Sequence, residues 1–361
     1  MGLYFILTEA IVAPFSIELK TENCDVEVFG PSGYGSYAIG AGHNIFQNTR
    51  FRVPDYALIV ANEFASADFV EGSQVESRRF GVMWHQNQGG VLRIEDSVFH
   101  TGMATFLAKG CYPKIEVSRS KLISDNGIIL QLMDMDDPGL GKDSAEVDTG
   151  VAEKNPAHQV SQPNHHDVVM FNKIERKDYC TDLQASFSHM ELSGDFYNGI
   201  TGPASVGTVF EGEMPDMSAP PPEDMGLPQN GSDFVPPMPE MKPSSFYPIN
   251  LVLEFVGTRY SGALSATRTH HRTTHITPEN NYELGMVENT LCPAVNNGVI
   301  ARFDDNSSWL VTKPCYLTAL TLAPGASVLA PDGKSLTMLV DGTETPIEPR
   351  TYTGNIEMRL N

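Results

Sequence analysis

The sequence predicts an all-β fold of the parallel β-helix type, a solenoid in which equivalent strands of successive coils pair in parallel. Five short apolar segments near the N-terminus carry this prediction, because their first residues are 19, 24, 23 and 25 positions apart. Between them lie segments in which apolar and polar residues alternate, as in half-buried strands. The first kind comprises residues 37–41, 56–60, 80–84, 103–107 and 128–132, and the second 44–48, 67–71, 91–97 and 114–120.

Strands rather than helices are expected from about Glu22 to Asp134, because each apolar run of four to six residues is bounded by turn-forming residues. The run after Asp125-Asn126-Gly127 is long enough for a buried helix turn, but its length and these turn residues favour a strand. The strand pattern resumes at Val168 and again after Pro248. We therefore expect one solenoid domain over residues 1–361, with closing coils at 298–361.

Two interruptions predict long loop insertions, at about 138–167 and 205–248. The first is rich in Gly and Asp. In the second, the stretch from Glu211 to Pro243 holds nine prolines, five methionines and seven acidic residues among 33. Such a composition cannot bury a core and favours an extended, polyproline-like surface segment. The alternative is a soft-metal site built from the methionine thioethers.

The charge balance excludes some partners. The chain carries 24 basic and 45 acidic residues, a net charge of −21, which repels nucleic acid and anionic membranes. No transmembrane run occurs. The first ten residues are apolar but lack a basic region and reach Glu9 too early for a signal peptide, so we expect the start of an excised or processed domain.

The five cysteines show no CxxC spacing and their number is odd, so neither a zinc site nor a complete disulfide framework is predicted. Cys292 and Cys315 are the one pair considered for a disulfide bond. A buried free cysteine behaves as a small apolar side chain and fits equally well into a repeat core.

Three stretches carry a family resemblance. The segment from Asn306-Ser-Ser-Trp to Tyr352-Thr-Gly, with Glu95-Asp-Ser-Val-Phe and Ser118-Arg-Ser-Lys-Leu, resembles right-handed parallel β-helix domains of cell-surface and secreted proteins from gut Gram-positive bacteria. The resemblance to the pectate-lyase-like superfamily is looser. The resemblance to the cell-surface and secreted domains implies a right-handed solenoid and an extracellular or cell-surface location, often with an adhesin-like role. The acid clusters of the lyases and hydrolases with this fold match no stretch here, so no catalytic residue is transferred.

An acidic cluster, Asp134, Asp136 and Asp137, follows the fifth repeated segment. Paired carboxylates at coil ends could act as general acid and base on a glycosidic bond, with His85, His100 or Arg93 as partners, or could bind calcium. Calcium is the one cofactor considered. The alternative is an acidic turn, because Asp137 precedes Pro138-Gly139.

A mixed aromatic and polar group predicts a ligand-binding site: Trp84, His85 and Asn87, with His100 one coil later. Sugars stack on indole rings and bond to amides and imidazoles. The alternative reading of Trp84 is a large side chain that fills a gap in the core.

Two histidine-rich stretches complete the candidates. His165, His166 and Asp167 in the first insertion are candidate metal ligands, and Arg268, His270, His271 and Arg272 are candidate ligands of a carboxylated sugar. The alternative is a solvated loop, because no spacing fixes a metal geometry.

These observations favour a non-catalytic domain that binds a glycan, a polysaccharide or another cell-surface protein. The alternatives are a polysaccharide lyase or glycoside hydrolase that works in a groove along the β-helix, and a metal-dependent role. In each case the insertions are expected to carry specificity, because loops on a rigid scaffold commonly do so.

Overall fold

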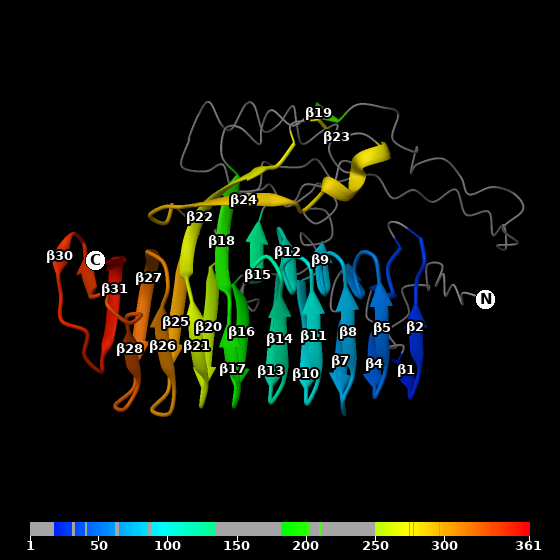
Figure 1. Cartoon of the computed structure of the whole chain (residues 1–361), viewed down its shortest axis with the longest axis horizontal. Helices are drawn as coiled ribbons and strands as arrows, with labels where there is room; N and C mark the ends of the chain where they lie inside the picture. The colour runs from blue at the N-terminus through cyan, green and yellow to red at the C-terminus, as the bar shows by residue number, and fades with distance from the viewer. Residues whose placement is uncertain are drawn as a thin grey trace, which may run out of the picture.

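The structure is a computed structural model of the whole chain (Figure 1). It describes residues 18–361 except 31–32, 40–41, 62–64, 86–87, 134–181, 202–208, 211–249, 274, 277 and 296. Within these residues the fold is all-β with long stacks of parallel strands, as predicted, and one 3₁₀ segment, η5 (Pro278–Glu283). No helix among them is long and apolar enough to cross a membrane.

Three long stacks of strands make up the molecule. In spatial order, sheet A contains β1 (Glu18–Glu22), β4 (His43–Gln47), β7 (Ser66–Val70), β10 (Gln88–Glu95), β13 (Tyr112–Ser118), β16 (Leu183–Ser188), β20 (Leu251–Val256), β25 (Val299–Phe303), β27 (Cys315–Leu322), β31 (Thr351–Leu360), β29 (Leu336–Val340) and β30 (Thr343–Glu344). Sheet C contains β3 (Ser36–Ile39), β6 (Leu58–Ala61), β9 (Val82–His85), β12 (Phe106–Lys109), β15 (Ile128–Met133), β18 (Asp195–Thr201), β22 (Leu264–His271) and β24 (Val287–Leu291).

The third stack is divided into two sheets. Sheet B contains β2 (Asp25–Glu27), β5 (Arg50–Val53), β8 (Gln74–Ser77), β11 (Val98–Thr101) and β14 (Lys121–Ser124). Sheet D contains β17 (Glu191–Ser193), β21 (Arg259–Gly262), β26 (Ser308–Val311) and β28 (Ser327–Leu329). A small sheet E pairs β19 (Val209–Phe210) with β23 (His275–Ile276).

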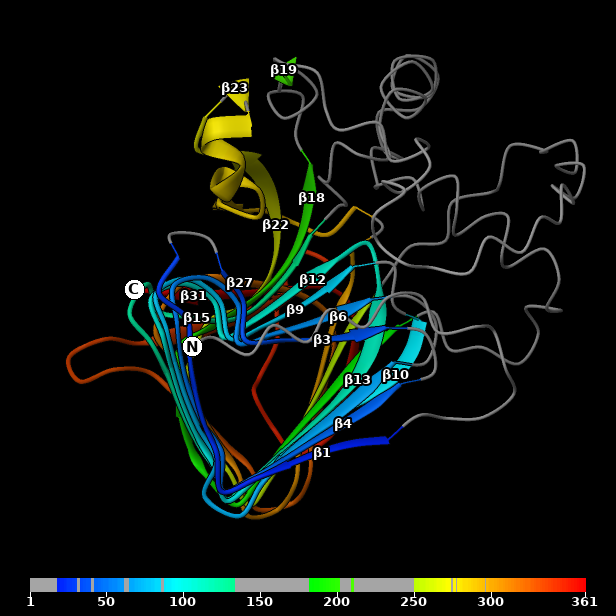
Figure 2. The ribbon, with the colours of Figure 1, turned by 90° about the vertical axis from the view of Figure 1, so that its right-hand side faces the viewer.

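The chain visits the stacks in a fixed order. From β1 to β22 it runs through one strand of sheet A, one of sheet B or D and one of sheet C. Except at the break between sheets B and D, the next three strands pair with these in parallel, as β7, β8 and β9 do with β4, β5 and β6. Figure 2 shows the three stacks facing a common interior. We call each such set of three strands a unit.

The repeated segments found in the sequence coincide with sheet C. Tyr37, Ile59, Met83, Leu107 and Gln131 are successive partners in its ladder, at spacings of 22, 24, 24 and 24 residues. The ladder is therefore more regular than the spacing of the segments: Tyr37 pairs with Ile59 and not with Tyr56, an offset of three residues, and the later segments are at most one residue out of step. The alternating segments of the second kind form sheet A.

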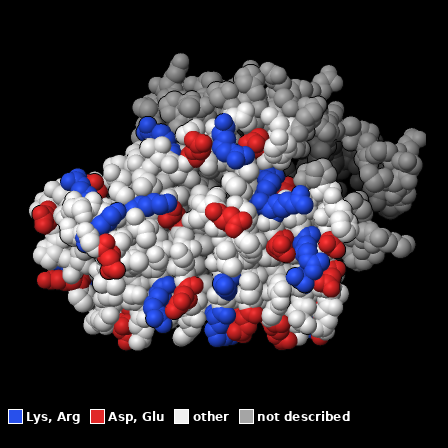
Figure 3. Space-filling view, in the orientation of Figure 1, with Lys and Arg blue, Asp and Glu red and all other residues white. Residues whose placement is uncertain are grey.

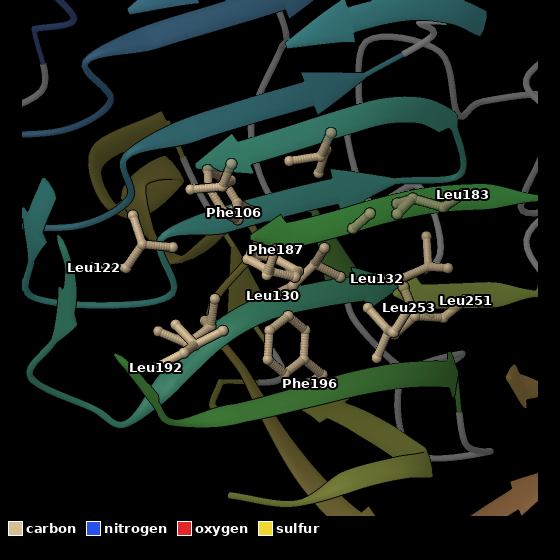
Figure 4. Close-up of a cluster of buried hydrophobic side chains, with 14 of the residues drawn as sticks. Phe106, Leu122, Leu130, Leu132, Leu183, Phe187, Leu192, Phe196, Leu251 and Leu253 are labelled. Carbon is tan, nitrogen blue, oxygen red and sulfur yellow. The ribbon is translucent and has the colours of Figure 1, made fainter. Parts of the chain in front are cut away.

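Alternation builds the core. In sheet A the burial pattern of β7, β13 and β20 alternates, so every second side chain points inward. Figure 4 shows leucines and phenylalanines from sheets A, B, C and D meeting in the interior. Phe255 stacks on Phe303 with ring centroids 4.5 Å apart, and Phe303 stacks on Trp309 at 5.7 Å. Like residues thus pack on like residues along the stack.

The turn from sheet A to sheet B or D repeats a two-part device. A residue with left-handed backbone, such as Asn48, Asp96 or Arg119, begins the turn. A buried hydroxyl residue follows, as in Thr49, Ser97 and Ser120. These hydroxyls bond to the backbone of neighbouring units: Ser97 Oγ lies 3.3 Å from the Phe69 carbonyl oxygen, and Ser120 Oγ accepts from the Ser97 N–H. The buried backbone groups of each turn are satisfied in this way.

Replacing one of these hydroxyls should destabilise the fold measurably. Ser73 Oγ accepts a hydrogen bond from the Thr49 N–H and lies 2.9 Å from the Phe46 carbonyl oxygen. We expect Ser73→Ala to lower the free energy of unfolding in urea by about 1–3 kcal/mol, because buried polar groups lose their partner. Ser193→Ala, at an exposed position, is the control and should change it little. Equal effects of the two changes would contradict this account of the turn.

The parallel order ends near the C-terminus. β27 pairs with β31 in antiparallel orientation, and β29 pairs with both β31 and β30 in the same way. The turn at Pro331-Asp332-Gly333 lies between β28 and β29, where the Lys334 N–H donates to the Pro331 carbonyl. The last part of the expected closing coils is therefore antiparallel, in the spatial order β27, β31, β29, β30. It ends sheet A in a two-residue strand, a short edge that limits pairing with other chains.

Candidate functional site

Long connections leave the stack at one edge. From β4 to β22, the turns from sheet A to sheet B or D and from there to sheet C contain one to four residues. The turns from sheet C back to sheet A are equally short as far as β13, but those after β15, β18 and β22 contain 49, 49 and 27 residues. We call this border the C–A edge. The two predicted insertions, at 138–167 and 205–248, fall within the first two long connections, which lie mostly outside the described residues.

The third long connection, residues 272–298, lies on the outer side of sheet C, and we call it the strap (Figures 1 and 2). Its strand β24 pairs antiparallel with β22. Met286 is buried against Ile59, Met83 and Leu107, which point outward from sheet C. Both faces of sheet C are therefore covered, which explains why its strands are apolar throughout rather than alternating.

Amide side chains fasten the rest of the strap. Asn289 Nδ2 donates to Gln131 Oε1 at 2.7 Å, and the Thr267 hydroxyl donates to Asn289 Oδ1 at 2.8 Å. Asn297 Nδ2 donates to the carbonyls of Asn198 and Thr267. The strap is thus specified by buried hydrogen bonds as well as by apolar contact.

A buried ionic group lies under the strap. Arg79 Nη1 contacts both carboxylate oxygens of Asp55 at 2.8 Å, and Nη2 donates to the Leu284 carbonyl at 3.0 Å. The guanidinium carbon is 5.4 Å from the ring centre of Tyr56 and 5.3 Å from that of Phe80. Burial raises the pKa of Asp55 to about 6, while the charges of Arg79 and Lys109 oppose that shift. Because it is enclosed, this group has a structural role.

An exposed row of charges crosses the outer face of sheet A. Asp68, Arg93 and Glu116 are successive partners in the ladder, and Arg93 Nε lies 3.1 Å from Glu116. His43 Nε2 lies 3.2 Å from Asp68 at one end, and Lys114 pairs with Glu116 at the other. Hydrogen bonding from Lys114 lowers the pKa of Glu116, against the effect of its partial burial. We call these five residues the sheet A row.

The prediction that Trp84 is a stacking platform is wrong. Its side chain is 1% exposed and packs inside the stack, with its ring centroid 6.0 Å from that of Phe106. The burial of Trp84 fits the alternative, a large side chain that fills the core. His100 lies on the outer face of sheet B, where it contacts Asp125 at 2.8 Å. Trp84 and His100 therefore do not form one site. His85 ends β9, with its side chain outside the description, and Asn87 lies outside the described residues.

The basic stretch near residue 270 forms the end of β22. In a strand, Arg268 and His270 point to the same side. His270 Nε2 lies 3.2 Å from Glu288, and Arg272 makes a two-point contact with Glu283. Acidic residues of the strap thus neutralise part of this patch, while Arg268 is exposed. His271 is partly buried.

The remaining candidates cannot be placed. Asp134, Asp136, Asp137, His165, His166 and Asp167 lie outside the described residues. Within the described part of the chain, no three metal-binding side chains come together. Glu95 and Asp96 lie at the turn from sheet A to sheet B, where both contact Arg119. They are therefore away from the C–A edge.

On the face shown in Figure 3, the described residues form no large patch of one sign. Figure 3 shows Lys and Arg side chains next to Asp and Glu over this face. Arg52 with Glu27, Arg259 with Glu191 and Arg119 with Asp96 are examples. Such exposed pairs contribute little stability, about 0–1 kcal/mol each, and this face offers no focused field for a charged ligand.

The proposed disulfide bond is absent. Cys292 and Cys315 are both free thiols, as are Cys24 and Cys111. Cys315 is fully buried beside sheet C, where its Sγ donates to the Lys313 carbonyl. These thiols fill space in the stack or at its surface, as expected for small apolar side chains.

Thiol labelling should follow burial. Burial raises the pKa of the Cys315 thiol to about 12, so almost no reactive thiolate forms at neutral pH. We expect iodoacetamide to modify exposed Cys24 in the native protein and Cys315 only after unfolding. Peptide mass spectrometry without reductant measures both. A peptide pair linked through Cys292 and Cys315 would contradict the free-thiol assignment.

Comparison with known proteins adds no family. No protein-family profile, curated protein or solved structure matches the chain. The all-β architecture with parallel strand stacks is compatible with the predicted solenoid. Two features were missed from the sequence: the sheet A row and the strap. The row occupies equivalent outward positions of alternating strands, so a correct register would have revealed it.

Proposed function

We propose that this protein is a right-handed parallel β-helix domain, displayed on a cell surface or secreted, that binds a glycan or another surface ligand without catalysis. The parallel stacking of units supports the solenoid part of this proposal. Its surface setting and adhesin-like role come from the resemblance of the 306–354 region to domains of gut Gram-positive bacteria.

One observation carries the binding role. All three long connections leave at the C–A edge, although each unit offers three corners where a loop could be inserted. A fold that needs only short turns gains nothing in stability from two 49-residue connections at one border. Loops gathered on one side of a rigid scaffold are the usual way to build a recognition surface.

The sheet A row supports a polar, hydroxyl-rich ligand. Its carboxylates, guanidinium, ammonium and imidazole offer acceptors and donors on neighbouring strands, which lie about 4.8 Å apart. Arg93 and Lys114 have side chains 55% and 53% exposed, so a ligand can reach them. Glu116, whose pKa is lowered, stays ionised at neutral pH and suits hydrogen-bond acceptance better than proton donation.

A polysaccharide microarray tests the proposal. The full chain should bind at least one class of glycan, and Arg93→Ala with Lys114→Ala should weaken that binding about tenfold or more, since a hydrogen bond to a charged group is worth about 1.5–3 kcal/mol. Arg259→Ala, an exposed arginine on sheet D, is the control. Release of reducing or unsaturated sugar ends from the bound glycan would replace the binding role with the catalytic alternative. Binding unchanged in the double variant would remove the row from the site.

A further inference from the structure

We propose that the strap is an anchor that holds β19, the described strand of the second long connection, on the outer side of sheet C. The point of contact is sheet E. β19 belongs to that connection, and β23 lies in the strap, and the two pair in parallel through Val209 with His275 and Phe210 with Ile276.

Sheet E cannot hold itself together. Each of its strands has two residues, and even an isolated two-stranded hairpin is only marginally stable in water. One of the two strands must therefore be held in place by something else. The strap supplies this support, because β23 leads through η5 directly into the segment that is fixed to sheet C.

The strap is fixed at three separate levels of the stack. Leu284 is held by Arg79, next to β9, and Met286 is buried among outward side chains of β6, β9 and β12. Asn289 bonds to Gln131 of β15 and to Thr267 of β22. Loss of one contact should therefore loosen the strap only in part, whereas blocking its path over sheet C should lift it.

Gly285 is where that path is tightest. A Cβ atom at this position would lie 2.6 Å from Leu107 Cδ2 and 3.5 Å from both Lys109 Cε and Phe80 Cζ. Its φ of 78° also favours glycine. The change Gly285→Val should lift the strap from sheet C, and it replaces no residue of the stack itself.

A matched control exists in the same chain. Gly333 has the same φ of 78°, but nothing lies within 4 Å of its Cβ position. Gly333→Val therefore introduces the same backbone strain, in the turn between β28 and β29, without touching the strap. The difference between the two variants reports the contact with sheet C alone.

The consequence concerns the recognition surface. If the strap sets where Val209 and Phe210 lie, it fixes one point of the connection that joins β18 to β20. The inference rests on these contacts and not on the ligand of the proposed function, so either can fail without the other.

Hydrogen–deuterium exchange by mass spectrometry on the full chain tests it. In Gly285→Val, peptides covering 209–210 and 275–291 should both exchange about tenfold faster or more, while peptides of β10, β13 and β16 keep wild-type rates. Gly333→Val should match the wild type in all of them.

Two results would overturn the anchor: unchanged protection at 209–210 while the strap loses its own, or no protection at 209–210 in the wild type. If Gly285→Val loosens the stack peptides as well, Asn289→Ala is the second variant. It removes the bonds to Gln131 and Thr267, and it must loosen 209–210 together with the strap if the anchor is real.

Discussion

Arg79→Met should be among the most damaging single changes in the described part of the chain, lowering the free energy of unfolding by about 3 kcal/mol at neutral pH. The guanidinium holds the Asp55 carboxylate and the Leu284 carbonyl at once, and both side chains are nearly buried, at 11% and 8% exposure. Methionine fills similar space but leaves the carboxylate without its cation. Urea unfolding followed by circular dichroism measures the loss.

The pH dependence of that loss identifies its cause. Arg79 lowers the pKa of Asp55, which burial has raised to about 6, so its removal must raise this pKa further. A carboxyl group whose pKa is raised by folding contributes stability below that pKa and loses it as the pH rises through it. The difference between Arg79→Met and the wild type should therefore shrink between pH 8 and pH 5.

A second change provides the control. Adding Asp55→Asn to Arg79→Met replaces the unpaired carboxylate by a neutral group, so the double variant should recover part of the stability at pH 8 and show no such pH dependence. A single variant whose loss is the same at both pH values would contradict the role given to Asp55.

Trp84→Ala should cost about 3–5 kcal/mol of stability, the usual range for emptying a buried aromatic site. The indole is 1% exposed and packs against Phe106 inside the stack. Thermal and urea unfolding measure this, and the variant should still bind whatever ligand the protein binds if it is assayed well below its melting temperature.

His100→Ala is the comparison for Trp84→Ala. The imidazole is about half exposed on sheet B, and its ion pair with Asp125 is also exposed, so we expect His100→Ala to lower the free energy of unfolding by less than about 1 kcal/mol. Loss of ligand binding with full stability in Trp84→Ala would instead restore the indole as a binding platform.

Local patterns in the sequence were sufficient to predict the stacked strands. Apolar runs of strand length at a period near 24 residues predicted sheet C, and alternation predicted which side chains of sheet A point inward. The turns between sheets A and B carry a still more regular pattern. Thr49, Ser73, Ser97 and Ser120 are 24, 24 and 23 residues apart, and each occupies the equivalent position in its turn. Aligned on these residues, the register would have been correct.

The contents of the site were harder to predict, for physical reasons. Met83 and Trp84 are neighbours in a strand buried on both faces, so composition could not say which points inward. The strap contacts residues about 200 positions earlier, as Leu284 does with Arg79, and no local pattern marks such a contact. The ladder that brings Asp68, Arg93 and Glu116 together likewise exists only once the register is known.

The central claim is that a regular stack carries the fold while the long connections carry recognition. A chain in which two- to four-residue turns, like those before β7 and β13, replace residues 134–181 and 202–249 tests it most directly. The stack should close across both splices, because β13 pairs with β16 and β16 with β20 in continuous register. We predict a wild-type β-sheet spectrum and a cooperative urea transition with its midpoint nearly unchanged. A chain that is unfolded, or that has lost its cooperative transition, would show that the long connections are part of the fold and would contradict the account.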